Sequence, residues 1–119
     1  MTLTKDGLGA IVECNAAADT DIITVGSDNK NIYVRGLLIF NQSTASNQTC
    51  EIHIIPNNSG SVGAKADNNK IGRLTLTASD TAFFEFPYPL TLTTEHDRIV
   101  ISNMVGAKVN VLPIGDVES

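Results

Sequence analysis

Short runs in which apolar and polar residues alternate constrain the fold of this chain more than any other feature. The clearest run covers residues 31–41, Asn-Ile-Tyr-Val-Arg-Gly-Leu-Leu-Ile-Phe-Asn. A period of two residues places successive side chains on opposite faces, as in a β-strand. The second half of the run is apolar on both faces, so we expect a strand in the centre of its sheet. Strict alternation would place Ile32, Val34, Leu38 and Phe40 on one shared face.

Similar runs follow one another along the chain, with turn-forming residues such as Pro87-Tyr-Pro between them. No stretch of 11 or more residues shows the 3.6-residue period of a helix, so we expect an all-β chain. Seven or eight short strands at this spacing predict an antiparallel β-sandwich, immunoglobulin-like or jelly-roll in topology. The expected strands cover residues 21–25, 31–41, 49–55, 71–77, 81–86, 90–94, 98–102 and 108–113.

A chain of 119 residues has the length of one domain. We expect a single β-sandwich domain over residues 21–115, an N-terminal arm or edge strand over residues 1–20, and a tail over residues 116–119. Residues 57–70 form the longest break in the alternation. Because loops of this length in compact domains are usually functional or mobile, we expect this one to face a partner.

The charge balance excludes two classes of partner. Lys and Arg total 8 against 13 Asp and Glu, which gives a net charge of −5. Such a chain lacks the basic surface that neutralises nucleic-acid phosphates or anionic lipid headgroups. No apolar run approaches the roughly 20 residues of a membrane helix, and the N-terminus lacks the pattern of a secretory signal. We therefore expect neither nucleic acid nor a membrane as partner.

Residues that could carry catalysis are few and scattered. His53 is expected on the solvent side of a strand, and His96 precedes Asp97 at a predicted turn, where an Asp more often caps a backbone amide than orients a base. Cys14 and Cys50 are interpreted as free buried thiols, although a disulfide would form if their Cα atoms lay within about 7 Å. A nucleophile with an adjacent base is not in evidence, so we expect no enzyme.

Metal and cofactor signals are also weak. The sequence contains no clustered Cys and His at zinc spacing, no twelve-residue calcium loop and no glycine-rich nucleotide motif, so no cofactor or metal is expected. Sugar-binding sandwiches stack pyranose rings on exposed aromatic side chains. With no Trp in the chain, Tyr33 and Tyr88 are the candidate platforms.

The remaining signal is for contact with other chains. Phe83 and Phe84 are adjacent, so in a strand they point to opposite faces, and one of them enters a second apolar layer or meets another chain. The apolar residues of the arm and the long loop are the other candidates. The candidate interface residues are Leu3, Leu8, Ile11, Val12, Val62, Lys65, Phe83 and Tyr88.

Several segments in a fixed order also carry a family resemblance. After an arm of small residues come Asp-Ile-Ile-Thr-Val-Gly, Ile-Tyr-Val-Arg-Gly-Leu-Leu-Ile-Phe-Asn-Gln-Ser and Ile-Ile-Pro-Asn-Asn. Phe-Glu-Phe-Pro-Tyr-Pro-Leu, Asp-Arg-Ile-Val-Ile-Ser and Val-Asn-Val-Leu-Pro-Ile-Gly follow. Over roughly residues 20–115 this order of strands and turns resembles the short all-β virion proteins of tailed bacteriophages, notably marine and cyanobacterial ones.

The resemblance implies a function as well as a fold. Such proteins are β-sandwiches that act as capsid decoration (cement), connector or tail components, and the likeness transfers no catalytic residues. It leads us to expect a non-enzymatic capsid decoration protein that bridges capsomers. Its expected partners are copies of itself, as a trimer, and the major capsid protein or another virion protein. Its location would be the virion, after synthesis in the host cytoplasm. The alternatives are a tail, connector or baseplate subunit, and a carbohydrate-binding host-attachment module.

Overall fold

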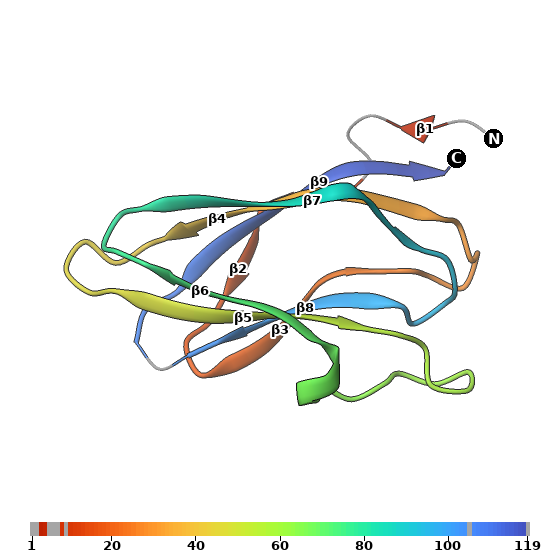
Figure 1. The fold of residues 1–119 in the computed structure, drawn as a ribbon, viewed down its shortest axis with the longest axis horizontal. Helices are drawn as coiled ribbons and strands as arrows, with labels where there is room; N and C mark the ends of the chain where they lie inside the picture. Colours follow the sequence, from red (N-terminus) through yellow and green to blue (C-terminus); the bar gives the residue numbers. More distant parts are fainter. Residues whose placement is uncertain (1–2, 5–7, 9, 105, 119) are drawn as a thin grey trace.

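The computed structural model describes residues 3–4, 8, 10–104 and 106–118 (Figure 1). In this part of the chain the only helical segment is a short 3-10 turn, η1, over Asp67–Asn69. The strands are β1 (Leu3–Thr4), β2 (Val12–Cys14), β3 (Ala18–Thr24), β4 (Ile32–Asn41), β5 (Gln48–Ile55), β6 (Lys70–Leu76), β7 (Thr81–Leu92), β8 (Arg98–Asn103) and β9 (Val109–Glu118).

The strands form two antiparallel sheets that pack face to face as two layers (Figure 1). In the first sheet β9 lies between β2 and β4, β4 lies between β9 and β7, and the short β1 pairs with the far end of β9. The second sheet has the order β3-β8-β5-β6. The prediction of an antiparallel β-sandwich is therefore confirmed, and β4 is central in its sheet as expected.

The strand pairs are nested like the two arms of one long hairpin. β2 pairs with β9, β3 with β8, β4 with β7, and β5 with β6, all antiparallel. The midpoint of every such pair falls within about two residues of Ser61, where an isolated bridge joins Asn58 and Ser61. The long hairpin formed by these pairs is folded over on itself, so that β4 also pairs with β9 and β5 also pairs with β8. Of the two topologies expected, this is the jelly roll.

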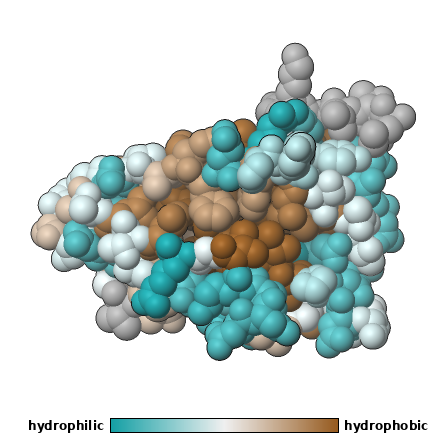
Figure 2. All heavy atoms as spheres, in the orientation of Figure 1, coloured by the Kyte–Doolittle hydropathy of each residue, from teal (hydrophilic) through white to brown (hydrophobic). Residues whose placement is uncertain are grey.

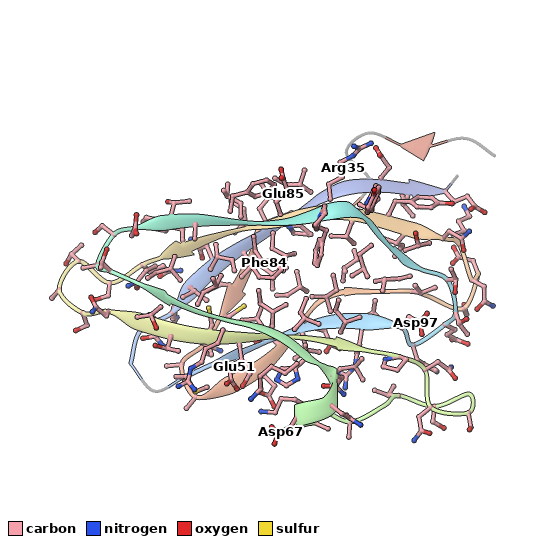
Figure 3. All side chains as sticks on the ribbon, viewed as in Figure 1. Arg35, Glu51, Asp67, Phe84, Glu85 and Asp97 are labelled. Carbon is pink, nitrogen blue, oxygen red and sulfur yellow. The ribbon has the colours of Figure 1, made fainter. Side chains whose placement is uncertain are left out.

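The core fills the space between the two sheets, and Figure 2 shows hydrophobic side chains gathered in the middle of that view, between the two layers. Leu37 and Ile39 of β4 face Ile52 of β5 and Ile99 and Ile101 of β8, and all five are 0% exposed. Figure 3 shows Phe84 of β7 pointing into the same space, where its ring meets that of Phe86 edge to face at 5.5 Å. These side chains come from strands far apart in the sequence, so their burial holds the two layers together.

Buried amide side chains close one end of the sandwich. Asn103 donates from Nδ2 to the carbonyl oxygens of Cys14, Asn15 and Ala107 at 2.9–3.2 Å. Its Oδ1 accepts from Nε2 of Gln48 at 2.7 Å. Asn103 therefore ties the β2–β3 and β8–β9 connections to the start of β5, and its burial is tolerated because all these groups are paired.

A β-bulge changes which residues of β4 face the core. The pairing of β4 with both neighbours shifts between Val34 and Gly36. An extra residue in a strand reverses the alternation beyond it. Leu37 and Ile39 therefore join Val34 in the core, while Leu38 and Phe40 lie on the outer face. The expectation that Leu38 and Phe40 share a face with Ile32 and Val34 is wrong for this reason.

Three further boundaries differ from those expected. Residues 87–89 do not end a strand, because β7 continues through them with a register shift opposite β4 that projects Tyr88 into solvent. Residues 116–118 belong to β9 rather than to a tail. Residues 1–20 were expected to form an arm or an edge strand, and residues 12–14 do form β2 at the edge of a sheet, but residues 18–20 already belong to β3.

Candidate interaction surface

The outer faces of the two sheets differ in how they are covered. On the β3-β8-β5-β6 sheet, the outward residues Glu51, His53, Ile55, Val100 and Ser102 are all less than 9% exposed. They are buried because residues 57–69, here called the covering segment, fold back over that sheet (Figure 1). The long loop thus lies against the protein's own sheet.

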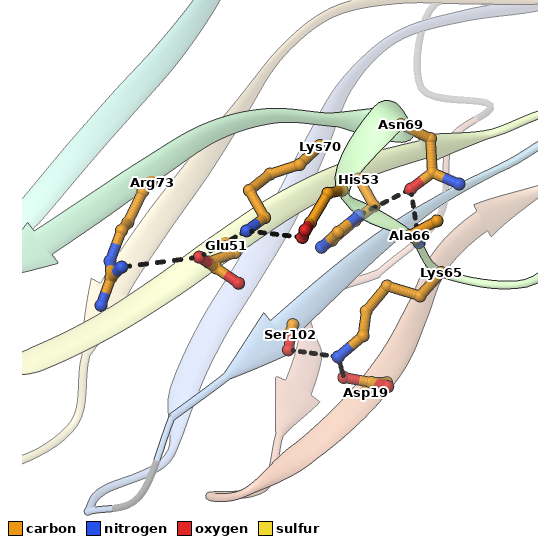
Figure 4. A network of polar contacts seen from close by, with 10 residues as sticks. Asp19, Glu51, His53, Lys65, Ala66, Asn69, Lys70, Arg73 and Ser102 are labelled. Atoms are coloured by element: carbon orange, nitrogen blue, oxygen red, sulfur yellow. Dashed lines mark hydrogen bonds and ion pairs between the residues drawn. The ribbon is translucent and has the colours of Figure 1, made fainter.

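Polar side chains fix the covering segment in place (Figure 4). Lys65 Nζ bonds to Asp19 and to the Ser102 hydroxyl, both at 3.1 Å. Asn69 Oδ1 lies 2.7 Å from Nδ1 of His53 and also accepts from the Ala66 amide. His53 is consequently 1% exposed. The expectation that it faces solvent is wrong, because sequence alone could not show that a distant segment covers it.

The charged groups here are paired, and their pKa values reflect that pairing. Burial alone raises the pKa of Asp19, but the Ser102 hydroxyl and the Lys65 ammonium outweigh it and lower the pKa. The Glu51 carboxylate, 3.1 Å from Lys70 Nζ, raises the pKa of that lysine. Asp67 and Arg73 extend the ion-pair network at 3.5 and 3.7 Å. The outer side of this sheet is therefore polar, and its ion pairs form within the chain.

The outer face of the β2-β9-β4-β7 sheet is apolar instead. Leu38 of β4 lies opposite Phe83 of β7 on one side and Leu112 of β9 on the other. Ile11 extends this row toward the sheet edge, and a shallow hollow of about 210 Å³ is lined by Ile11, Leu38, Phe40, Asn110 and Leu112. We call the following residues the apolar face: Ile11, Leu38, Phe40, Phe83, Leu112 and Ile114.

The exposure of this face is large for its residue types. Ile11 is 62% exposed, Phe83 is 47%, and Leu38, Phe40 and Ile114 are 36–37%. With about 150–250 Å² per large side chain, these fractions correspond to about 400 Å² of contiguous apolar surface. Patches of this size on a monomer are often functional. No part of the described chain covers it as residues 57–69 cover the other sheet.

Gly36 determines how Phe83 lies on this face. A Cβ atom at Gly36 would come within 2.6–2.7 Å of the Phe83 ring. The ring therefore lies across the backbone of Gly36, in a cross-strand aromatic–glycine arrangement that shields the glycine. Figure 3 shows the neighbouring Arg35 and Glu85 projecting from the same outer side of the sheet.

Charged groups border the apolar face at both ends of the strands. At one end Arg35 pairs with Asp116 at 3.4 Å. At the other, Glu13 pairs with Lys108 at 3.3 Å and accepts from Gln42, and these contacts lower the pKa of Glu13. An apolar centre with a polar rim is the usual anatomy of a protein–protein interface.

The structure brings together only some of the predicted interface residues. Ile11 and Phe83 both lie on the apolar face, and Tyr88 (85% exposed) and Val62 (55%) are exposed elsewhere. The expectation for Leu8 is corrected, because it is 5% exposed within the core.

The remaining three predicted residues lie in different settings. Val12 packs against the core and is half-buried, and the Lys65 side chain is bonded to the protein's own sheet but remains 38% exposed. A contact of Val12 or Lys65 with another chain stays a prediction. The side chain of Leu3 lies outside the described residues, although its backbone pairs with Glu118.

Four residues of the apolar face were missed as contact residues: Leu38, Phe40, Leu112 and Ile114. Strict alternation, carried through the bulge between Val34 and Gly36, placed Leu38 and Phe40 on the same face as Ile32 and Val34. The signal that could have found them is the apolar character of both faces of residues 37–40, which requires cover on both sides.

The candidate catalytic residues have structural partners. Asp97 accepts hydrogen bonds from the backbone amides of Asn57, Thr93 and Thr94 at 2.8–3.2 Å. Partial burial raises the pKa of Asp97, but these amides outweigh it and lower the pKa. The interpretation of Asp97 as a turn-capping residue is confirmed, and His96 beside it occupies the left-handed region at φ 78°.

Both cysteines are free and 0% exposed in the core, as interpreted. Burial raises the pKa of each thiol to about 11. A thiol with a raised pKa holds almost no thiolate at neutral pH and is a poor nucleophile.

No protein-family model and no curated protein matches this chain, so the interpretation of this surface depends on its geometry. Among the described residues, no three His, Cys, Asp or Glu side chains are grouped as metal ligands. In the same part of the chain no helix has the length and apolarity needed to span a membrane.

Proposed function

We propose that this chain is a non-enzymatic structural subunit that works by binding other protein surfaces in an assembly. The observation that carries the proposal is the contrast between the two sheets. One outer face is covered by the chain's own residues 57–69, while the other exposes about 400 Å² of apolar side chains within a charged rim. Burying that face in an assembly removes apolar surface from water, which is the main driving force of association.

The assembly we propose is a phage virion, with the chain as a capsid decoration protein that joins copies of itself to the major capsid protein or another virion protein. Support comes from the order of segments that resembles small phage virion proteins, and from the jelly-roll strand order, which viral capsid domains use repeatedly. Each copy would bury a modest area, and many copies on one lattice would add to a strong attachment.

Cryo-electron microscopy of the virion, with this chain traced in the map, tests the proposal. Copies at the joints between capsomers would support decoration, with the apolar face buried. Rings of six or twelve copies around the tail axis would favour the tail, connector or baseplate alternative. Absence of the chain from the particle would refute a virion role.

Carbohydrate binding is a second proposal, favoured by Tyr88. Tyr88 is 85% exposed, and its chain neighbours Pro87 and Pro89 line a hollow of about 340 Å³. The lining residues include Arg35, Phe83, Glu85 and Phe86, which combine apolar rings with charged hydrogen-bonding groups. A glycan array tests it, with Tyr88→Ala as the matched variant. Binding that this substitution removes would support a host-attachment role, and an array without hits would refute it.

A further inference from the structure

The charged residues at the rim of the apolar face are arranged so that a second copy of this chain can match them. Lys108, just before β9, and the alternate β9 residues Asn110, Leu112, Ile114 and Asp116 follow one another along the outer side of the sheet. Lys108 and Asp116 lie at opposite ends of this series, each four residues from Leu112, which is about 13 Å along the strand. Along the line of β9 the face therefore has a cation, Lys108, near one end and an anion, Asp116, at the other, with an apolar residue midway.

We propose that the apolar face is the contact between two copies of this chain, related by a two-fold axis that runs across the strands along the row Phe83–Leu38–Leu112. This inference rests on the proposed assembly function and names its first partner. A half-turn about such an axis reverses the strand direction. A residue that precedes the row on one strand therefore faces, in the second copy, the residue that follows the row by the same distance on the same strand. Two sheets packed this way keep their strands nearly aligned, about 10 Å apart.

The charges at the rim match under this rotation. Lys108 of each copy meets Asp116 of the other, and Arg35 comes to the end that holds Glu13 and Gln42 of the other. Each end already contains one intrachain ion pair, Arg35–Asp116 or Glu13–Lys108. Association therefore joins two pairs into one network of alternating sign at each end of the contact. Complementary charges of this kind fix the orientation of a contact.

The alternative two-fold axis, parallel to the strands, matches the charges less well. It sets like ends against each other, so the carboxylates Glu85 and Asp116 of one copy lie against those of the other. Among the described residues, Arg35 is the cation that forms an ion pair with Asp116 at that end. The axis across the strands avoids this repulsion.

The available area supports the contact. About 400 Å² of apolar surface per copy is half of the roughly 800 Å² per partner of a standard interface, and the charged rim residues add to it. A single face-to-face contact about a two-fold axis closes at two copies. The expected mass is therefore twice 12.7 kDa. The trimer expected from the resemblance remains a prediction, and the same mass measurement distinguishes it from the dimer.

Matched substitutions test the face. Ile114 and Ile71 are the same residue type at similar exposure, 37% and 42%, but Ile114 lies on the apolar face and Ile71 on edge strand β6. We expect Ile114→Arg to weaken dimerisation about 100-fold in sedimentation velocity, since the change occurs twice per contact. Ile71→Arg should leave dimerisation unchanged. Thermal unfolding of both variants checks that each remains folded.

Crosslinking tests the orientation. A short bismaleimide should join Lys108→Cys copies to Asp116→Cys copies in a mixture, while either variant alone stays uncoupled. The native thiols are buried, so unsubstituted protein is the reagent control. Covalent dimers of Lys108→Cys alone would overturn the proposed axis.

The outcomes separate this inference from the proposed function. A wild-type dimer that Ile114→Arg dissociates and Ile71→Arg does not would support both. A trimer, or a dimer insensitive to Ile114→Arg, would overturn the two-fold contact while leaving an assembly role intact. A monomer at all concentrations would overturn the contact as well, and the virion map would then decide the proposed function independently.

Discussion

Gly36→Ala tests how the bulge in β4 shapes the apolar face. A Cβ atom at this position would lie 2.6–2.7 Å from the Phe83 ring and 2.8 Å from the Phe84 carbonyl oxygen. The ring can rotate away, but the carbonyl belongs to the backbone of β7 and can move only with that strand. Overpacking of this kind costs about 1–3 kcal/mol.

The expected loss corresponds to a Tm lower by about 4–12 °C for a domain of this size, measured by circular dichroism on heating. Gly26→Ala is the matched control, because the nearest atom to its Cβ would be Asp28 Oδ1 at 3.8 Å. That variant should stay within about 0.5 kcal/mol of the wild type.

A double-mutant cycle identifies the contact responsible. Combining Gly36→Ala with Phe83→Ala removes the ring but leaves the clash with the Phe84 carbonyl. We therefore expect the two changes to be non-additive by about 1 kcal/mol, with Gly36→Ala costing less when Phe83 is absent. If Gly36→Ala were as stable as Gly26→Ala, the packing of Phe83 across Gly36 would be refuted.

Three further predictions follow from the buried polar groups and thiols. Asn103→Ala should lower the free energy of unfolding by about 3 kcal/mol in urea titration, because it leaves buried carbonyl oxygens without a donor; Asn47→Ala, at an exposed position, should be nearly neutral. Because the folded-state pKa of Asp97 is lowered, its stabilisation is present above the unfolded pKa of about 3.9 and is lost as pH falls through the folded pKa. Asp97→Asn should therefore be less stable at pH 7, with the difference shrinking in acid unfolding below about pH 4. Cys14 and Cys50 should react with a thiol reagent at pH 8 only on unfolding, because their pKa values are raised to about 11; fast reaction of folded protein would contradict their burial.

The strands were predictable because local alternation encodes them. The predicted strands over residues 31–41 and 49–55 match β4 and β5 to within one residue at each end, and turn-forming residues separate most of the others. The bulge between Val34 and Gly36 was not predictable, because it is a register shift of β4 against β7 and β9, two strands that are distant in the sequence. Since a bulge reverses the alternation beyond it, Leu38 and Phe40 lie on the outer face and not on the face of Ile32 and Val34.

The candidate site was only partly predictable for the same kind of reason. Phe83 was found because adjacent phenylalanines in a strand cannot share a face. The burial of His53 and the bonding of Lys65 were not found, because both depend on the covering segment folding back over its own sheet. The pairing that places Leu112 of β9 beside Leu38 of β4 was also not predictable, because it depends on the order of all the strands and not on local sequence.

The central claim, that the apolar face is buried in the working assembly, is tested most directly by hydroxyl-radical footprinting with mass spectrometry. Phe83 and Phe40 report on the face, while Tyr88 and Ile71 are exposed references outside it. On raising the protein concentration from a dilute to an assembled sample, we predict that oxidation of Phe83 and Phe40 falls several-fold and that of Tyr88 and Ile71 stays constant. Equal oxidation of Phe83 in both samples would contradict the claim.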